Sequence, residues 1–201
     1  MKLLKYIPNL LTLLNLLSGT IAIIFAVNND LITAAYFVFL GIFFDFFDGF
    51  AARMLKVSGE LGKQLDSLAD VVTSGVVPGI VLFQLLKSDK AQLLVSNINI
   101  SWKNSNFEIL PYIGLLFTLG AAYRLAKFNI DERQTSSFIG LPTPAAALVV
   151  LSLPLILASG VSEMIIDIIL NKWLLIAVTI LLVILMNSEI HLFSLKFKNL
   201  E

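Results

Sequence analysis

The stretch FLGIFFDFFDGFAAR, residues 39–53, is an apolar run interrupted by two acidic residues, Asp45 and Asp48. Its phenylalanine, leucine and isoleucine residues do not alternate with polar ones, so it predicts an embedded helix and not a half-buried strand. A charged aspartate at the middle of a membrane helix costs at least about 2.5 to 3.5 kcal/mol and needs ions, protons or water around it. This stretch therefore indicates both the fold and the chemistry.

The rest of the chain has the same apolar character. Of its 201 residues, 58% are hydrophobic and only 14% are charged, which is more apolar surface than a soluble domain of this size buries. A helix needs about 20 apolar residues to span a bilayer. Six stretches approach this requirement, at residues 10–27, 31–52, 65–86, 109–128, 141–158 and 173–186. We therefore predict an all-α, polytopic membrane bundle of about six transmembrane helices, forming a single domain over residues 1–201.

The ends of these stretches suggest an orientation. Residues 1–9 are expected to form a short interfacial helix that Pro8 ends before the first span. Ten of the 14 Lys and Arg residues fall on one side of the six spans, together with both termini. Because positive residues are retained in the cytoplasm, both termini are expected there. The zero formal net charge and the lack of a basic stripe give no reason to expect nucleic acid as a partner.

A second acidic pair, Asp66 and Asp70, lies at the head of the next apolar stretch, in QLDSLADVV at residues 64–72. Residues three or four apart on a helix point about 60° or 40° from one another, so each pair shares one helix face. In an antiparallel hairpin centred near Val57, the two pairs reach the same depth. All four carboxylates are therefore expected to meet in one pocket.

Four carboxylates in a partly desolvated cavity repel one another, and hard divalent cations with oxygen ligands resolve this repulsion. Two such ions commonly stabilise the attacking and leaving oxygens in phosphoryl chemistry. Spacing alone leaves two alternatives open. One is a proton or cation pathway through the bundle, which also uses intramembrane aspartates. The other is a purely structural role.

Small residues accompany the acidic pairs. Gly49 and Ala52 follow the first pair, and Gly62 precedes the second. Such residues remove side chains where a ligand or a neighbouring helix approaches the backbone. Their placement indicates that the pocket receives a ligand, although each one also suits ordinary helix packing.

The complete pattern, Asp45-x2-Asp48-Gly49-x2-Ala52-Arg53-x8-Gly62-x3-Asp66-x3-Asp70, resembles the signature of the CDP-alcohol phosphatidyltransferases. The resemblance implies a six-helix membrane protein, usually a homodimer, with its active site facing the cytoplasm. Such an enzyme cleaves a CDP-linked lipid, transfers the phosphatidyl group to an alcohol and releases CMP. It uses Mg²⁺ or Mn²⁺, and two ions are expected.

The resemblance also implies roles for individual residues. Asp70 would share the second ion and act as the general base toward the acceptor hydroxyl. The metal ligands would be Asp45, Asp48, Asp66 and Asp70. The CDP-lipid site would be lined by Gly49, Ala52 and Gly62, with Arg53 near it. The sole histidine, His191, lies beyond the last predicted span and is expected to be non-catalytic.

Further stretches bear on the acceptor alcohol. Residues 7–19, 66–78, 123–129 and 140–146 look like the bacterial and archaeal membrane-type phosphatidylserine synthases. This resemblance implies CDP-diacylglycerol and L-serine as substrates and a bacterial plasma membrane as the location. Arg124 is the candidate for binding the acceptor, with Asn129 and Thr73 as weaker candidates. Two alternatives remain: a glycerol-3-phosphate acceptor, and a cation or proton transporter.

Overall fold

The computed structural model describes residues 6–57, 59–87, 109–130 and 138–192, and only the backbone of residues 138–139 and 191–192. Its elements, in chain order, are α1 (Ile7–Val27), α2 (Leu31–Met54), α3 (Glu60–Asp70), a π-helical turn (Val71–Val76), α4 (Val77–Lys87), a 3₁₀ segment (Leu110–Leu115), α6 (Leu116–Ile130), β1 (Phe138–Ile139), α7 (Thr143–Ala158), α8 (Glu163–Ile169), α9 (Lys172–Asn187) and β2 (His191–Leu192). The all-α prediction is confirmed for the described residues, apart from these two short strands.

Within the described residues, fewer helices are long enough to span a bilayer than the six predicted. Three helical runs are long and apolar enough to cross a bilayer, namely Ile7–Val27, Leu31–Met54 and Glu60–Lys87. Counting the bent pair α8 and α9, which meet at 53°, as one broken span raises the number to four within the described residues. The six predicted stretches all coincide with helical segments, but α7 has only 16 residues. The prediction of six spans is therefore not confirmed.

The start of the chain also differs from the prediction. Helix α1 begins at Ile7 and includes Pro8 in its first turn, where a proline is tolerated because its missing N–H would be unpaired anyway. Pro8 thus lies in the first turn of the first long helix. Residues 1–5 of the predicted interfacial helix lie outside the described residues.

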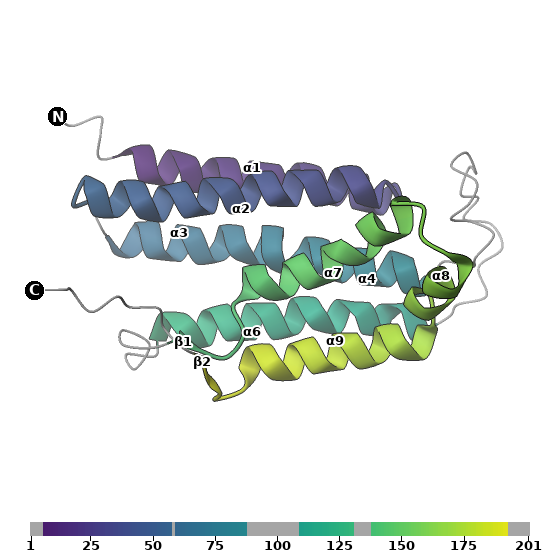
Figure 1. The fold of residues 1–201 in the computed structure, drawn as a ribbon. Helices are drawn as coiled ribbons and strands as arrows, with labels where there is room; N and C mark the ends of the chain where they lie inside the picture. Colours follow the sequence, from purple (N-terminus) through teal and green to yellow (C-terminus); the bar gives the residue numbers. More distant parts are fainter. Residues whose placement is uncertain (1–5, 58, 88–108, 131–137, 193–201) are drawn as a thin grey trace, which may run out of the picture.

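Figure 1 shows α1 and α2 side by side as an antiparallel pair, with the run from α3 to α4 packed along them. The turn between α1 and α2 contains Asn29 at a φ of 64°. The Asp30 side chain then accepts a hydrogen bond from the N–H of Thr33 and caps α2. Small residues, including the fully buried Ala26 and Ala34, let the helix backbones approach closely.

The start of α1, the turn between α2 and α3, and the C-terminal ends of α6 and α9 lie at the same end of the bundle (Figure 1). Much of the outer surface is apolar, for example Phe46 at 64% exposed and Leu119 at 65%. Such side chains are compatible with lipid around the bundle, since lipid acyl chains are as apolar as these side chains. The long apolar helices and this surface indicate a membrane protein.

Candidate active site

Three carboxylates form the centre of the site. Asp45 and Asp48 project from α2 and Asp66 from α3, and one carboxylate oxygen of each lies within 4.8 Å of those of the other two. The antiparallel packing of α2 and α3 brings them together, although Asp48 and Asp66 are 18 positions apart in the sequence. Asp48 is only 7% exposed, so bulk water screens this group poorly.

The three carboxylates suit a metal ion. All the potential ligands are oxygens, which Mg²⁺ and Mn²⁺ prefer. The Oδ1 atom of Asp66 is buried and has no hydrogen-bond partner among the described residues. Because a buried unpaired oxygen is costly, a cation at this position would satisfy it and relieve the repulsion among the carboxylates. The cluster can therefore hold a divalent metal ion.

Helix α1 contributes polar side chains to the same site. The Thr12 hydroxyl donates a hydrogen bond to Oδ2 of Asp48. One turn further along, Nδ2 of Asn15 donates to Oδ1 of Asp70 at 3.3 Å. Both residues are buried, and they lie on the face of α1 that packs against α2 and α3. These bonds orient one carboxylate from each pair.

Asp70 lies beside the three-carboxylate cluster and not within it. It is buried on the last turn of α3, close enough to Asp45 for their charges to interact. The positive charge of Arg124 also acts on Asp70. Its carboxylate thus accepts a hydrogen bond from Asn15 and feels the positive charge of Arg124 in addition to the negative charges of the cluster. The predicted convergence of all four aspartates on one metal-binding pocket stays a prediction for Asp70.

Arg124 reaches this position from α6. Its side chain is buried at 8% exposed, and Nη1 donates to the Thr143 hydroxyl at 2.9 Å. The guanidinium also lies over the Phe128 ring, 6.0 Å from its centroid. Its Nε has no hydrogen-bond partner among the described residues. Arg124 therefore offers an unpaired buried donor close to Asp70.

The other two predicted acceptor-binding residues make contacts between helices. The side-chain amide of Asn129 donates to Oγ of Ser67 at 2.9 Å, and its backbone carbonyl accepts from Nζ of Lys63 at 2.7 Å. These bonds fasten the end of α6 to α3. The fully buried Thr73 lies in the π-helical turn, and its hydroxyl donates to the backbone carbonyl of Asn15 at 3.2 Å.

The residues predicted to line the CDP-lipid site lie near the α2–α3 turn. A Cβ atom added at Gly49 would meet none of the described residues within 4 Å, so they leave this face of α2 open. One at Gly62 would lie 3.3 Å from Oδ1 of Asn9, in the first turn of α1. Ala52 is half-buried, and the exposed Arg53 donates from Nε to the Gly49 carbonyl at 3.0 Å. There is room for a ligand over Gly49, one turn from the carboxylates.

Gly41 makes the close approach of α2 to the site possible. A Cβ atom there would lie 2.7 Å from Cγ2 of Thr73 and 2.8 Å from Oδ1 of Asn15. We expect Gly41→Ala to destabilise the protein by about 1 to 3 kcal/mol, because the π-helical turn must move. Thermal unfolding in detergent should show a lower Tm. Gly49→Ala is the matched control for stability, since it meets open space; equal Tm values for the two variants would contradict this packing.

Comparison with known proteins identifies the family of the chain. A sequence model of the CDP-alcohol phosphatidyltransferase family matches residues 5–186, which include every residue described above. The chain belongs to the CDP-alcohol phosphatidyltransferase family. It is 35% identical over 165 residues to the CDP-diacylglycerol–serine O-phosphatidyltransferase of Bacillus subtilis, covering 78% of this chain and 82% of that protein.

Two other members of the CDP-alcohol phosphatidyltransferase family show more distant similarity. The CDP-diacylglycerol–serine O-phosphatidyltransferase of Helicobacter pylori strain J99 is 32% identical over 71% of this chain and 54% of its own length. The archaetidylserine synthase of Methanothermobacter thermautotrophicus is 32% identical over 73% of this chain and 56% of its own length. The chain thus spans about half the length of these two relatives.

The structure adds residues for which no role was predicted. Thr12 and Asn15 hold carboxylates of this phosphatidyltransferase, and Thr143 holds Arg124. A signal for the first two does exist in the sequence: Thr12, Asn15 and Ser18 recur at three-residue intervals in an otherwise apolar helix. Such a polar stripe on a membrane helix predicts a face turned toward other protein or a ligand.

Proposed function

We propose that the protein transfers the phosphatidyl group from CDP-diacylglycerol to the hydroxyl of L-serine, giving phosphatidylserine and CMP. The observation that carries this proposal is the three-carboxylate cluster, with Asp70 and Arg124 beside it. The family match supports phosphatidyl transfer from a CDP-linked lipid. The names of the Bacillus and Helicobacter relatives support serine over glycerol 3-phosphate as the acceptor.

Asp45, Asp48 and Asp66 would hold Mg²⁺ or Mn²⁺, and Asp70 would share a second ion. When bound, these ions would neutralise the diphosphate of the CDP-lipid and make CMP a better leaving group. The open face of α2 at Gly49 would admit the nucleotide, with Ala52, Arg53 and Gly62 around it.

Asp70 would accept the proton of the serine hydroxyl. The serine oxygen then bonds to the phosphorus that carries the diacylglycerol, and the bond from that phosphorus to the CMP oxygen breaks, with its electron pair leaving on CMP. Asn15 holds Oδ1 of Asp70 in place, so that Oδ2 is the oxygen available to the proton. Because Asp70 is buried, few water molecules compete with the serine hydroxyl.

Arg124 would bind the serine carboxylate through the N–H groups that Thr143 does not use. The Oδ1 atom of Asn15 is buried and has no partner among the described residues, so it can accept a hydrogen bond from the serine ammonium. The N–H groups of Arg124 are hydrogen-bond donors, whereas Oδ1 of Asn15 is an acceptor, and both residues lie near Asp70. This combination suits an amino acid, which carries both charges.

Purified protein in mixed micelles with CDP-diacylglycerol and Mn²⁺ is expected to release CMP when L-serine is added. We expect the rate of CMP release with glycerol 3-phosphate to be at least about 100-fold lower. Glycerol 3-phosphate has no ammonium group to donate a hydrogen bond to Oδ1 of Asn15, so this buried oxygen would stay unpaired. Faster CMP release with glycerol 3-phosphate would favour that acceptor instead. No CMP with either acceptor, together with cation or proton flux in liposomes, would indicate a transporter.

The proposal extends to the protein's surroundings. We place it in a bacterial plasma membrane with both termini and the active site facing the cytoplasm. The α2–α3 turn, with Arg53, Lys56 and Lys63 in or near it, and the C-terminal end of α6, with Lys127, lie at the same end of the bundle (Figure 1). This concentration of positive charge supports the orientation. We also propose a homodimer, as the family resemblance implies.

A further inference from the structure

A short linker, made of β1 and the two residues after it, leads toward α7. Residues 138–141, called here the linker, are bound along their backbone to residues 185–192, called here the clasp. Strands β1 and β2 pair in antiparallel register. The N–H of Gly140 donates to one clasp carbonyl at 2.9 Å, and the N–H of Leu141 donates to another at 3.0 Å.

The linker can lie this close only because of a glycine. Gly140 has a φ of 73°, in the left-handed region that favours glycine. A Cβ atom there would also lie 2.6 Å from the carbonyl oxygen of Met186 and 3.0 Å from that of Ser188. The backbone of the linker therefore packs directly against the last turn of α9.

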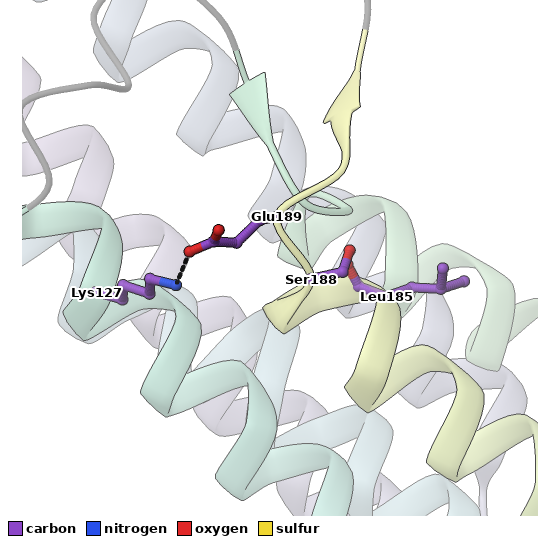
Figure 2. Close-up of polar contacts among 4 residues, drawn as sticks. All are labelled: Lys127, Leu185, Ser188 and Glu189. Atoms are coloured by element: carbon purple, nitrogen blue, oxygen red, sulfur yellow. Dashed lines mark hydrogen bonds and ion pairs between the residues drawn. The ribbon is translucent and has the colours of Figure 1, made fainter.

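The clasp is also fastened to α6. Figure 2 shows the ion pair between Nζ of Lys127 and Oε1 of Glu189, which are 3.7 Å apart. The same view shows Ser188, whose hydroxyl donates to the Leu185 carbonyl at 2.9 Å and closes the last turn of α9. Deeper in the bundle, the Asn187 amide donates to the Gly120 carbonyl at 3.2 Å.

The linker leads straight into the active site. Two residues after Leu141, the fully buried Thr143 hydroxyl accepts the hydrogen bond from Arg124. Arg124 belongs to α6, whereas Thr143 begins α7, so the bond joins two elements that the clasp holds from outside. No clasp residue belongs to the carboxylate cluster.

Resting on the proposed function, we propose that Thr143 is a positioning residue for Arg124 and that the clasp keeps Thr143 at the required place. Serine binding then depends on residues at the C-terminal end of α9, beyond the carboxylates. Binding of CDP-diacylglycerol and of metal does not depend on them, because those contacts come from α2 and α3. A variant that weakens the clasp should therefore change the KM for serine and leave the KM for CDP-diacylglycerol unchanged.

Thr143→Val removes the hydroxyl and keeps the shape of the side chain, whereas Thr143→Ser keeps the hydroxyl. We expect Thr143→Val to raise the KM for serine about tenfold, since a hydrogen bond to a buried charged group is lost. The KM for CDP-diacylglycerol should stay within about twofold of the wild-type value, and Thr143→Ser should restore most of the serine KM. Both constants come from CMP release.

Gly140→Ala tests the clasp itself and should raise the serine KM in the same selective way. If the clasp acts through Thr143, the two effects should not add. The serine KM of the Gly140→Ala/Thr143→Val double variant should then be no higher than that of the single variant with the higher serine KM. Should Gly140→Ala not fold, the exposed Glu189→Lys replaces it, with roughly a twofold rise in serine KM. The Lys127→Glu/Glu189→Lys double variant restores the ion pair with its charges exchanged, so it should reverse the rise in serine KM.

Three outcomes overturn the proposal. One is an unchanged serine KM in Thr143→Val, and another is an equal rise of both KM values. The third is strict additivity of the Gly140→Ala and Thr143→Val effects. If the wild-type protein releases no CMP with serine, the proposed function fails as well, so the two failures are distinguishable.

Discussion

Asp70→Asn is expected to lower kcat by about 10²- to 10⁴-fold, the usual contribution of a general base. The amide keeps the size of the carboxylate and can still contact Asn15, but it cannot accept the proton of the serine hydroxyl. Because Asp70 lies beside the three-carboxylate cluster, CDP-lipid binding should be partly retained. CMP release and binding of a CDP-lipid to the purified variant are the two measurements.

The control is Glu163→Gln, which removes one exposed carboxylate on α8, at the far end of the bundle from the α2–α3 turn (Figure 1). Its activity should match that of the wild type. Near-normal turnover in Asp70→Asn would rule out Asp70 as the base. Complete loss of CDP-lipid binding would instead show that Asp70 serves mainly to hold the nucleotide or its metal.

Asp66→Asn is expected to weaken Mn²⁺ binding by at least about 100-fold. This effect exceeds the usual loss of metal affinity when a residue that only orients a metal ligand is replaced. Asp66 is one of the three carboxylates within 4.8 Å of one another, and its buried Oδ1 lacks a partner among the described residues. Calorimetric titration of the metal-free protein with Mn²⁺ measures the affinity. CMP release should fall with it at low metal concentration.

Stability provides a second readout that does not depend on catalysis. Without metal, Asp66→Asn removes one of three mutually repelling charges, so the Tm of the metal-free variant should exceed that of the wild type. Added Mn²⁺ should raise the Tm of the wild type and hardly change that of the variant, since a ligand stabilises only the state that binds it. Equal stabilisation of both proteins by Mn²⁺ would show that Asp66 is not a ligand.

Several features of the site could be predicted because they depend on local spacing. The two acidic pairs lie on single helix faces at intervals of three or four residues, and the hairpin between them is short. Their meeting therefore follows from helical geometry and one turn. The π-helical turn after Asp70 could not be predicted, because it depends on how Thr73 packs between α1 and α2 and not on the composition of Val71–Val76.

Contacts between distant segments were missed for a different reason. The amide of Asn129 donates to Ser67, 62 positions away along the chain, and no local pattern predicts this contact. Its role in binding the acceptor stays a prediction. Helix α8 was not predicted at all, since seven residues with two acidic side chains carry little periodic signal. The prediction of six spans counted apolar stretches and could not foresee that some helices are shorter than a bilayer needs.

The sequence by itself determined the helical fold, the membrane environment and the acidic motif in 39–53 and 64–72, because apolar content and helical spacing are local properties. Only the tertiary structure separated Asp70 from the three-carboxylate cluster, by bringing Asn15 of α1 and Arg124 of α6 to it. It also showed that residues at and just after the end of α9 bind the backbone of Gly140 and Leu141, just before Thr143. These relations join residues far apart in the chain, and helix packing alone sets their distances.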